Sequence, residues 1–285
     1  MGLEKNPAIR FVLQRAGRVY TAGPAAENAV AVCESLAAQG FASIASFWTG
    51  YLDDPDLVCD SYIYLLDLIQ RMKLDCYLSV KATALGFKSE LVEKILHEAA
   101  AANTTIHFDS MAPDTVDRTF ALIEQARRTY SNLGYTLPAR WRRSRSDADR
   151  IIDLGLRVRI VKGQWSGLNG DDGDPQDGFV RLVDRLISKG CHHVAVATHN
   201  PAVAHATLSL LKNSGKSHEL ELLHKLPRHR MLKIARDYEA RTRVYVPCGE
   251  AGMPYRLKEI ARHPRILVWF TRDLIRSSWL SPTGS

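Results

Sequence analysis

The sequence predicts an α/β protein whose eight parallel strands close into a barrel, and three observations support this. Eight short runs rich in β-branched residues alternate with amphipathic stretches of helical period along the 285 residues. The runs read as apolar on both faces, as parallel strands covered by helices do. No GxGxxG follows the first run, which disfavours the open doubly wound sheet. We therefore predict a (β/α)8 TIM-type barrel, with residues 1–285 as one domain.

The first half of the chain contains a helical lead-in and four strand–helix units. The lead-in ends before Gly40, a residue suited to the left-handed conformation at helix ends. Pro55 suits the first turn of the next helix, where its missing N–H would have no partner. The predicted helices are residues 25–39, 55–72, 89–102, 114–133 and 147–154, and the predicted strands are residues 41–47, 76–83, 104–109 and 134–141.

The second half opens on residues 156–163, LRVRIVKG, a β-branched strand with a polar, glycine-ended exit. This stretch carries Arg159 within the strand and Lys162 at its close. This strand begins the fifth of eight strand–helix units, and the helix of the eighth unit is the last predicted helix. The predicted strands are residues 156–163, 192–198, 219–223 and 242–248, and the predicted helices are residues 175–189, 201–212, 226–239 and 254–262.

Composition and charge narrow the classes of function. The formal net charge is +7, and the densest basic run, residues 140–145, encloses an aromatic residue. Acidic residues are interspersed nearly everywhere else, so we predict that this run is a loop and that the chain binds no nucleic acid. No apolar window is long enough to cross a bilayer, which favours a cytoplasmic protein with at most peripheral membrane contact. The five cysteines lack CxxC spacing and therefore predict no zinc ribbon or disulfide framework.

The predicted strands end in polar residues. In a barrel of this class the loops at the carboxyl ends of the strands converge on one mouth, where catalysis takes place. Cations beside carboxylates in such a mouth can hold one another or bind an anionic ligand. The residues at these ends are Lys81, Asp109, Arg159, Lys162, Thr198, His199, Asn200, Glu221, His224, Tyr245, Cys248 and Glu250.

Five segments carry a resemblance to a known family. They are LSVKATALGF, IHFDS with TVDRTF behind it, LRVRIVKGQW, VAVATHN and VYVPCGEAGMPY. In this order they resemble proline dehydrogenase, over nearly the whole chain. The resemblance implies a distorted (β/α)8 barrel that binds FAD at its mouth. It also implies oxidation of L-proline to pyrroline-5-carboxylate by hydride transfer to the flavin, with a quinone or another electron acceptor.

The resemblance assigns a cofactor side of the mouth. Arg159 resembles the arginine beside the flavin's reactive nitrogen, where a positive charge favours the reduced anionic ring. The other positions that the resemblance places around the FAD ring, ribityl chain, phosphates and adenosine are Val161, Lys162, Gly163, Gln164, Thr198, His199, Asn200 and Glu221.

The substrate side departs from the family pattern. Lys81 and Asp109 resemble the pair that sets the ion-pair network of the substrate pocket, and Tyr245 and Tyr255 resemble aromatic residues around the substrate ring. The family's two adjacent arginines, which bind the substrate carboxylate, align with Lys258 and Glu259. A lysine lacks the bidentate fork and a glutamate repels a carboxylate. These differences favour an amine or amino-acid substrate whose charge differs from that of L-proline, unless Arg256 or Arg262 replaces the arginine pair.

Three other interpretations remain open from the residues. Lys81 or Lys162 could form a Schiff base in an aldolase-type barrel. A metal hydrolase would use Asp109, His199, His224 and Glu250, but the HxH of an early strand is missing, so no metal site is predicted. His107 and His192 are expected to face helices or solvent. The altered arginine pair would also suit a flavin-binding or partner protein that has lost catalysis.

Overall fold

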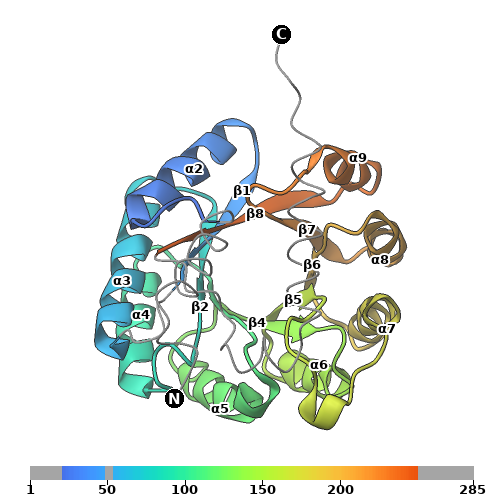
Figure 1. Ribbon diagram of the computed structural model, residues 1–285, viewed down its shortest axis with the longest axis horizontal. Coiled ribbons are helices and arrows are strands. Elements are labelled where there is room, and N and C mark those ends of the chain that lie inside the picture. The colour runs from blue at the N-terminus through green and yellow to red at the C-terminus, as the bar shows by residue number, and fades with distance from the viewer. Residues whose placement is uncertain (1–20, 49–53, 250–285) are drawn as a thin grey trace, which may run out of the picture.

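The strands of the protein form a closed ring in the computed structural model, which describes residues 21–48 and 54–249. Eight parallel strands pair in sequence order, and β8 pairs with β1 to close the barrel (Figure 1). This confirms the predicted (β/α)8 architecture. The strands are β1 (Ala42–Phe47), β2 (Cys76–Val80), β3 (Ile106–Phe108), β4 (Leu133–Pro138), β5 (Arg157–Val161), β6 (His193–Ala197), β7 (Ser217–Leu223) and β8 (Arg241–Cys248).

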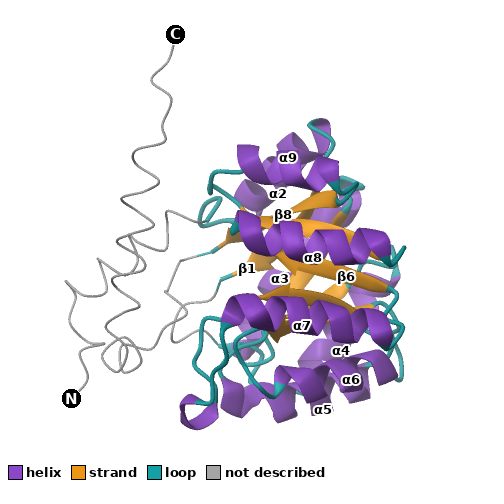
Figure 2. Ribbon diagram, turned by 90° about the vertical axis from the view of Figure 1, so that its right-hand side faces the viewer, coloured by secondary structure: helices purple, strands orange, loops and turns teal. Residues whose placement is uncertain are grey.

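Helices surround the ring on its outside (Figure 2). The predicted lead-in is confirmed as α2 (Ala26–Ala38), which packs on β1 and β8. The other α-helices of the described residues are α3 (Pro55–Arg71), α4 (Ser89–Ala100), α5 (Val116–Ala126), α6 (Ser144–Asp153), α7 (Pro175–Ser188), α8 (Pro201–Asn213) and α9 (His229–Asp237). Short 3₁₀ turns, η2 (Pro113–Thr115) and η3 (Leu168–Gly170), lie before α5 and α7. The helix predicted at residues 254–262 lies outside the described residues.

One predicted helix is too long. The helix predicted at residues 114–133 ends at Ala126, because side chains of the following segment bond to the loop before β3. The Tyr130 hydroxyl donates to the carbonyl of Thr104 (2.7 Å), and Nδ2 of Asn132 donates to the carbonyl of Asn103 (2.6 Å). These contacts hold the chain in the extended course that enters β4.

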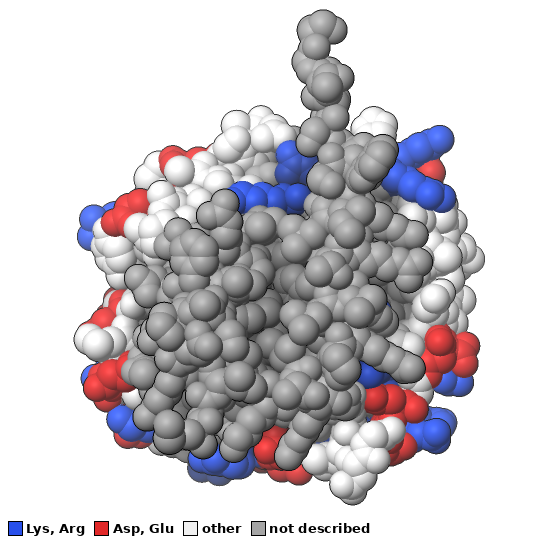
Figure 3. All heavy atoms as spheres, in the orientation of Figure 1, with Lys and Arg blue, Asp and Glu red and all other residues white. Residues whose placement is uncertain are grey.

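The basic run is also only partly a loop. Helix α6 begins at Ser144, three residues earlier than predicted, and includes Arg145. Carboxylates neutralise the run: Arg140 pairs with Asp172 at 2.8 Å, and Arg142 pairs with Asp171 at 2.6 Å. Basic and acidic side chains alternate around the visible edge of the described part (Figure 3). Among the described helices, none is long and apolar enough to span a membrane.

The outward faces of the strands form the main hydrophobic core. Leu78 and Val80 of β2, Phe108 of β3, Tyr135 of β4 and Ile160 of β5 pack against the surrounding helices and are at most 1% exposed. Burying a side chain of this size stabilises the fold by roughly 1.5–3 kcal/mol. The predicted apolar character of the strands is therefore confirmed on this face.

The inward faces are polar, which corrects the prediction of strands that are apolar on both faces. Ser79, His107, Thr136, Arg159 and Glu221 project into the barrel interior and are at most 4% exposed. Interiors of this fold class usually contain bulky branched residues instead. Since buried polar groups require partners, the interior must be organised by hydrogen bonds and ion pairs.

His107 shows how this interior is accommodated. Its ring is fully buried in the lumen, 3.0 Å from Thr136 Oγ1, so the prediction that it faces helices or solvent is wrong. The neighbouring strand residue Gly134 leaves the space that the imidazole occupies, because a Cβ there would collide with the ring. His192, in contrast, is exposed as predicted.

Replacing Gly134 with alanine should therefore destabilise the barrel. The new methyl group would displace the His107 ring and would lie 3.1 Å from the carbonyl oxygen of Arg157. Overpacking of this kind costs roughly 1–3 kcal/mol, measurable as a lower free energy of unfolding in urea. Gly173→Ala is the control, because its Cβ would lie 3.8 Å from its nearest neighbour and should change stability by about 0.5 kcal/mol or less. Equal stability of the two variants would contradict the steric account.

Candidate functional site

The centre of the candidate site is the guanidinium group of Arg159 on β5. Its side chain is 5% exposed and crosses the lumen to strands β2, β3 and β4. Nε and Nη2 donate to Thr136 Oγ1 at 3.1 and 2.9 Å, and Nη2 also donates to Ser79 Oγ at 3.4 Å. The same Nη2 forms an ion pair with Asp109. The cation is thus held by three strands besides its own.

Asp109, directly after β3, connects the cation to the strand ends. Its backbone N–H donates to the carbonyl of Val80 at 2.8 Å, which extends the pairing of β3 with β2 by one residue and fixes the direction of the carboxylate. Ser79 Oγ donates to Oδ1 at 2.6 Å, and the Tyr245 hydroxyl donates to Oδ2 at 3.0 Å. Both carboxylate oxygens therefore have donors, in addition to Arg159. Sequence reasoning singled out Asp109, Tyr245 and Arg159 separately, and the structure brings them into one network.

Glu221 on β7 faces Arg159 from the opposite side of the lumen. It is 2% exposed, and Oε1 accepts a hydrogen bond of 2.5 Å from the Tyr77 hydroxyl. Its Oε2 lies 3.7 Å from Nη1 of Arg159. Within the described part, neither of these two buried atoms has a hydrogen-bond partner. Burial raises the pKa of Glu221 to about 7, although the positive charge of Arg159 opposes the shift.

Arg159 remains a permanent cation in this environment. Burial opposes its charge, but Asp109, Tyr77 and Glu221 together raise its pKa above the ordinary arginine value. The pKa of Tyr245 is also raised, by burial and by the charge of Asp109, so its hydroxyl stays protonated and acts as a donor. The guanidinium carbon lies 5.4 Å from the centre of the Tyr245 ring, within range of a cation–π interaction.

Lys81 lies directly after β2, close to this network. Its Nζ donates to the carbonyl of Phe47 at 3.3 Å and lies 5.9 Å from the ring centre of Trp48. Burial lowers its pKa, while the negative charge of Asp109 opposes that shift. Trp48 also reaches Tyr245, with its Nε1 3.4 Å from the hydroxyl oxygen. Lys81 therefore shares aromatic and acidic neighbours with Arg159.

The residues after β5 form the next part of the mouth. Val161 ends β5, and Lys162 and Gln164 are exposed. Gly163 has φ +92°, and a Cβ there would lie 2.9 Å from Cβ of Pro138. The glycine therefore permits a tight turn that a larger residue would strain. This geometry explains the glycine-ended exit of the strand.

The residues after β6 bond mainly to the backbone. Oγ1 of Thr198 accepts from the N–H of Asn200 at 3.1 Å, and Nε2 of His199 accepts from the N–H of Leu223 at 2.9 Å. Asn200 caps α8 by accepting from the N–H of Ala202 at 2.9 Å. These hydrogen bonds shape the loop between β6 and α8, at the carboxyl end of the barrel beside β5 and β7.

Several predicted residues lie outside the described residues. They are Glu250, Tyr255, Arg256, Lys258, Glu259 and Arg262. Two residues of the metal-hydrolase interpretation already have protein partners. His199 accepts a hydrogen bond from the backbone N–H of Leu223, and Asp109 forms an ion pair with Arg159. The described part contains no group of three or more His, Cys, Asp or Glu side chains that could hold a metal.

Sequence reasoning missed the polar residues below the mouth. Ser79 and Tyr77 precede Lys81 by two and four residues, and His107 precedes Asp109 by two. Because side chains of a strand alternate between its faces, these residues point to the same side as the predicted site residues. This alternation was the available signal. Thr136 had no such marker, since no mouth residue was predicted on β4.

The comparisons with known proteins agree with this geometry. Proline dehydrogenase 1 of Bacillus subtilis subsp. natto is 23% identical over 274 residues, which cover 91% of this chain and 90% of that protein. Proline dehydrogenase 2 of Bacillus subtilis (strain 168) is 23% identical over 215 residues, covering 71% and 70%. No family model matches the chain.

Solved structures share the fold. Proline utilization A from Bdellovibrio bacteriovorus, inactivated by N-propargylglycine, has a TM-score of 0.73 at 14% identity over 88% of this chain. Proline utilization A from Corynebacterium freiburgense has a TM-score of 0.69 at 15% identity over 98% of this chain. The chain spans 32% and 35% of the lengths of those two proteins.

The chain is similar in sequence to proline dehydrogenases over most of its length and shares its barrel with proline utilization A. The family motifs coincide with the ends of the strands: LSVK ends at Lys81, IHFD at Asp109 and RIVKG at Gly163. Residue 221 on β7 is a glutamate. A titratable group therefore lies beside the Arg159 cation.

Glu221 should make the stability of this protein depend on pH. Its folded-state pKa of about 7 exceeds the reference value of 4.5, so the stabilisation is present below about pH 4.5 and is lost as the pH rises through 7. Relative to Glu221→Gln, the wild type should lose about 2–3 kcal/mol of unfolding free energy between pH 5 and pH 8. Urea denaturation at both pH values measures this. Glu98→Gln, an exposed carboxylate of α4, is the control, and parallel curves for wild type and Glu221→Gln would refute the assignment.

Proposed function

We propose that this protein is an FAD-dependent dehydrogenase that removes hydride from a carbon next to nitrogen in an amine or amino acid. The main observation behind this proposal is the buried Arg159 cation at the carboxyl end of the barrel, held by Asp109 and Thr136. Sequence similarity supports the flavin chemistry, because the similar proteins are named proline dehydrogenases. The product would be an imine, and a quinone or another acceptor would take the electrons.

The described residues fit a flavin at this position. Nη1 of Arg159 is buried and has no hydrogen-bond partner among the described residues, although a guanidinium group normally uses its donors. A polar cofactor atom would satisfy it. The residues that would hold FAD are Arg159, Val161, Lys162, Gly163, Gln164, Glu221, Thr198, His199 and Asn200. Bound FAD would supply the hydride acceptor, and a fixed cation favours its anionic reduced form.

The side chains of the network have separate tasks in this proposal. Asp109 and Thr136 hold the guanidinium group of Arg159, so that its charge does not reorient during the reaction. Tyr245 directs its hydroxyl to Asp109, which leaves the ring as an apolar wall beside the cation. Lys81 adds a second cation that can orient an anionic group of the substrate. Glu221 contributes a buried carboxylate beside the Arg159 guanidinium group, with its Oε2 3.7 Å from Nη1.

The proposed substrate is L-proline or, more consistent with the sequence, an analogue of different charge. Lys258 and Glu259 stand where the family has two arginines, and together they carry no net charge. Such a pair suits a substrate that carries a cationic group in addition to those of proline, or one that lacks the free carboxylate of proline. Lys81 and Tyr245, with Tyr255, would line the rest of the pocket.

A reduction assay tests the proposed function and its substrate. Purified protein should be yellow, and anaerobic addition of secondary amines and amino acids should bleach the flavin. We expect charge-altered analogues to bleach it faster than L-proline, and the double variant Lys258→Arg/Glu259→Arg to reverse that order. A colourless protein that FAD cannot reconstitute would overturn the function. Fastest bleaching by L-proline would overturn only the altered substrate.

The role of Arg159 can be measured in the same assay. Arg159→Lys keeps a charge but loses the planar fork that Thr136 and Asp109 orient, so flavin reduction should slow by about 100-fold. Arg181→Lys, at an exposed ion pair on α7, should stay within about twofold of the wild type. Equal rates for both variants would show that the Arg159 fork is not needed.

A second candidate function follows from the environment of Lys81. A buried lysine with a lowered pKa can act as a Schiff-base nucleophile. In that case borohydride with a carbonyl substrate should attach the substrate covalently to Lys81, and Lys81→Arg should abolish the adduct.

A protein that retains flavin without any turnover would instead favour a binding role.

A further inference from the structure

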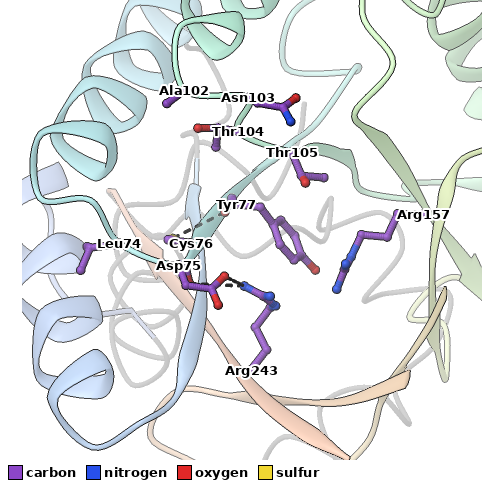
Figure 4. Close-up of a pocket in the computed structure, with 10 residues that line it drawn as sticks. All are labelled: Leu74, Asp75, Cys76, Tyr77, Ala102, Asn103, Thr104, Thr105, Arg157 and Arg243. Atoms are coloured by element: carbon purple, nitrogen blue, oxygen red, sulfur yellow. Dashed lines mark hydrogen bonds and ion pairs between the residues drawn. The ribbon is translucent and has the colours of Figure 1, made fainter. Parts of the chain in front are cut away.

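A cavity lies at the opposite end of the barrel from the candidate site. It has a volume of ≈ 210 Å³, far above the roughly 10–15 Å³ that one water molecule needs. Its walls come from the loops before β2 and β3 and from the amino-terminal ends of β2, β5 and β8. Its lining includes Asp75, Tyr77, Arg157 and Arg243 (Figure 4).

Two arginines present unused donors to this cavity. Figure 4 shows Arg157 and Arg243 reaching toward Tyr77 from different strands. Their guanidinium carbons lie 5.2 and 4.9 Å from the centre of the Tyr77 ring. Nε of Arg157 is buried without a hydrogen-bond partner in the described part. The Arg243 side chain is 5% exposed, and its Nη2 likewise makes no hydrogen bond to a described residue.

The charges around the cavity leave an excess of cations. Arg157 and Arg243 share the buried carboxylate of Glu219, and Arg243 and Arg241 share Asp75. Three guanidinium groups therefore face two carboxylates. Glu219 stays ionised, because His193, 3.9 Å away, and the cations Arg157 and Arg243 together outweigh burial and lower its pKa. Burial lowers the pKa of His193, so the histidine adds no full charge at neutral pH.

Tyr77 separates the cavity from the candidate site. Its ring lines the cavity, while its hydroxyl donates to Glu221, which faces Arg159. The two arginines of the cavity are therefore not part of the network around Arg159. They also serve no function that the proposed chemistry requires.

We propose that this cavity binds a small oxyanion, a phosphate or a carboxylate, between Arg157 and Arg243. The free N–H donors of both guanidinium groups match oxyanion acceptors, and planar forks bind phosphate and carboxylate alike. The excess positive charge compensates the charge of the ligand. Asp75 does not oppose binding strongly, because Arg241 and Arg243 already neutralise it. The site is independent of FAD.

Calorimetric titration of the wild-type protein tests this proposal. Inorganic phosphate and acetate are titrated separately, with chloride holding the ionic strength constant. At least one should bind saturably with one site per chain, and the tighter of the two identifies the ligand class. Absence of saturable binding by both anions would overturn the proposal.

Two variants with the same change in charge separate the cavity from general electrostatics. Arg157→Gln removes a lining donor and should weaken binding by about tenfold or more. Arg181→Gln is the control, because Arg181 lies in an exposed ion pair with Asp177 on α7 and does not line the cavity. It should change the affinity by about threefold or less. Equal weakening by both variants would overturn the proposal.

A second measurement does not depend on the variants folding. Crystals of the wild-type protein grown with selenate should show an anomalous peak between the Arg157 and Arg243 side chains. A cavity without a peak in crystals that bind selenate elsewhere would overturn the site.

Discussion

The structure depends on one desolvated charge, the Arg159 guanidinium group inside the barrel. A cation removed from water is tolerated only where carboxylates and hydrogen-bond acceptors surround it, and loss of a partner in such a pair costs roughly 3–5 kcal/mol. Asp109 after β3 and Glu221 on β7 provide the negative charge, and Thr136 on β4 accepts two of its hydrogen bonds. The same contacts that stabilise the barrel therefore fix the geometry of the site.

Polar and charged side chains form two layers in the lumen, one near the mouth and one below it. The two-residue period of the strands explains why both layers are polar. Arg159, Glu221 and Tyr245 belong to the layer near the mouth, and each has a partner two residues earlier in the other layer: Arg157, Glu219 and Arg243. Residues two apart on a strand face the same side, so polar residues in one layer accompany polar residues in the next. Tyr77 lies between the layers and contacts both. A polar lumen of this kind replaces the packed aliphatic layers usual in this fold.

The cofactor side and the substrate side of the proposed site are built from different parts of the chain. Arg159 and its partners belong to the closed ring of strands, where each change of charge would leave a buried group unpaired. Lys258 and Glu259 come after β8 in the sequence. The proposed change of substrate therefore concerns positions that follow the last strand in the sequence.

The sequence by itself determined the barrel, most boundaries of its elements, and the residues at the strand ends such as Lys81, Asp109 and Arg159. Periodicity and turn residues are local properties, so they can be read along the chain. Which ends meet, and what lies beneath them, was decided by the tertiary structure. The pairing of Arg159 with Glu221, the place of His107 beside Gly134 and the early end of α5 all depend on side chains far apart in sequence. Closure of the ring sets the register between strands, and that register, a non-local property, brings those side chains together.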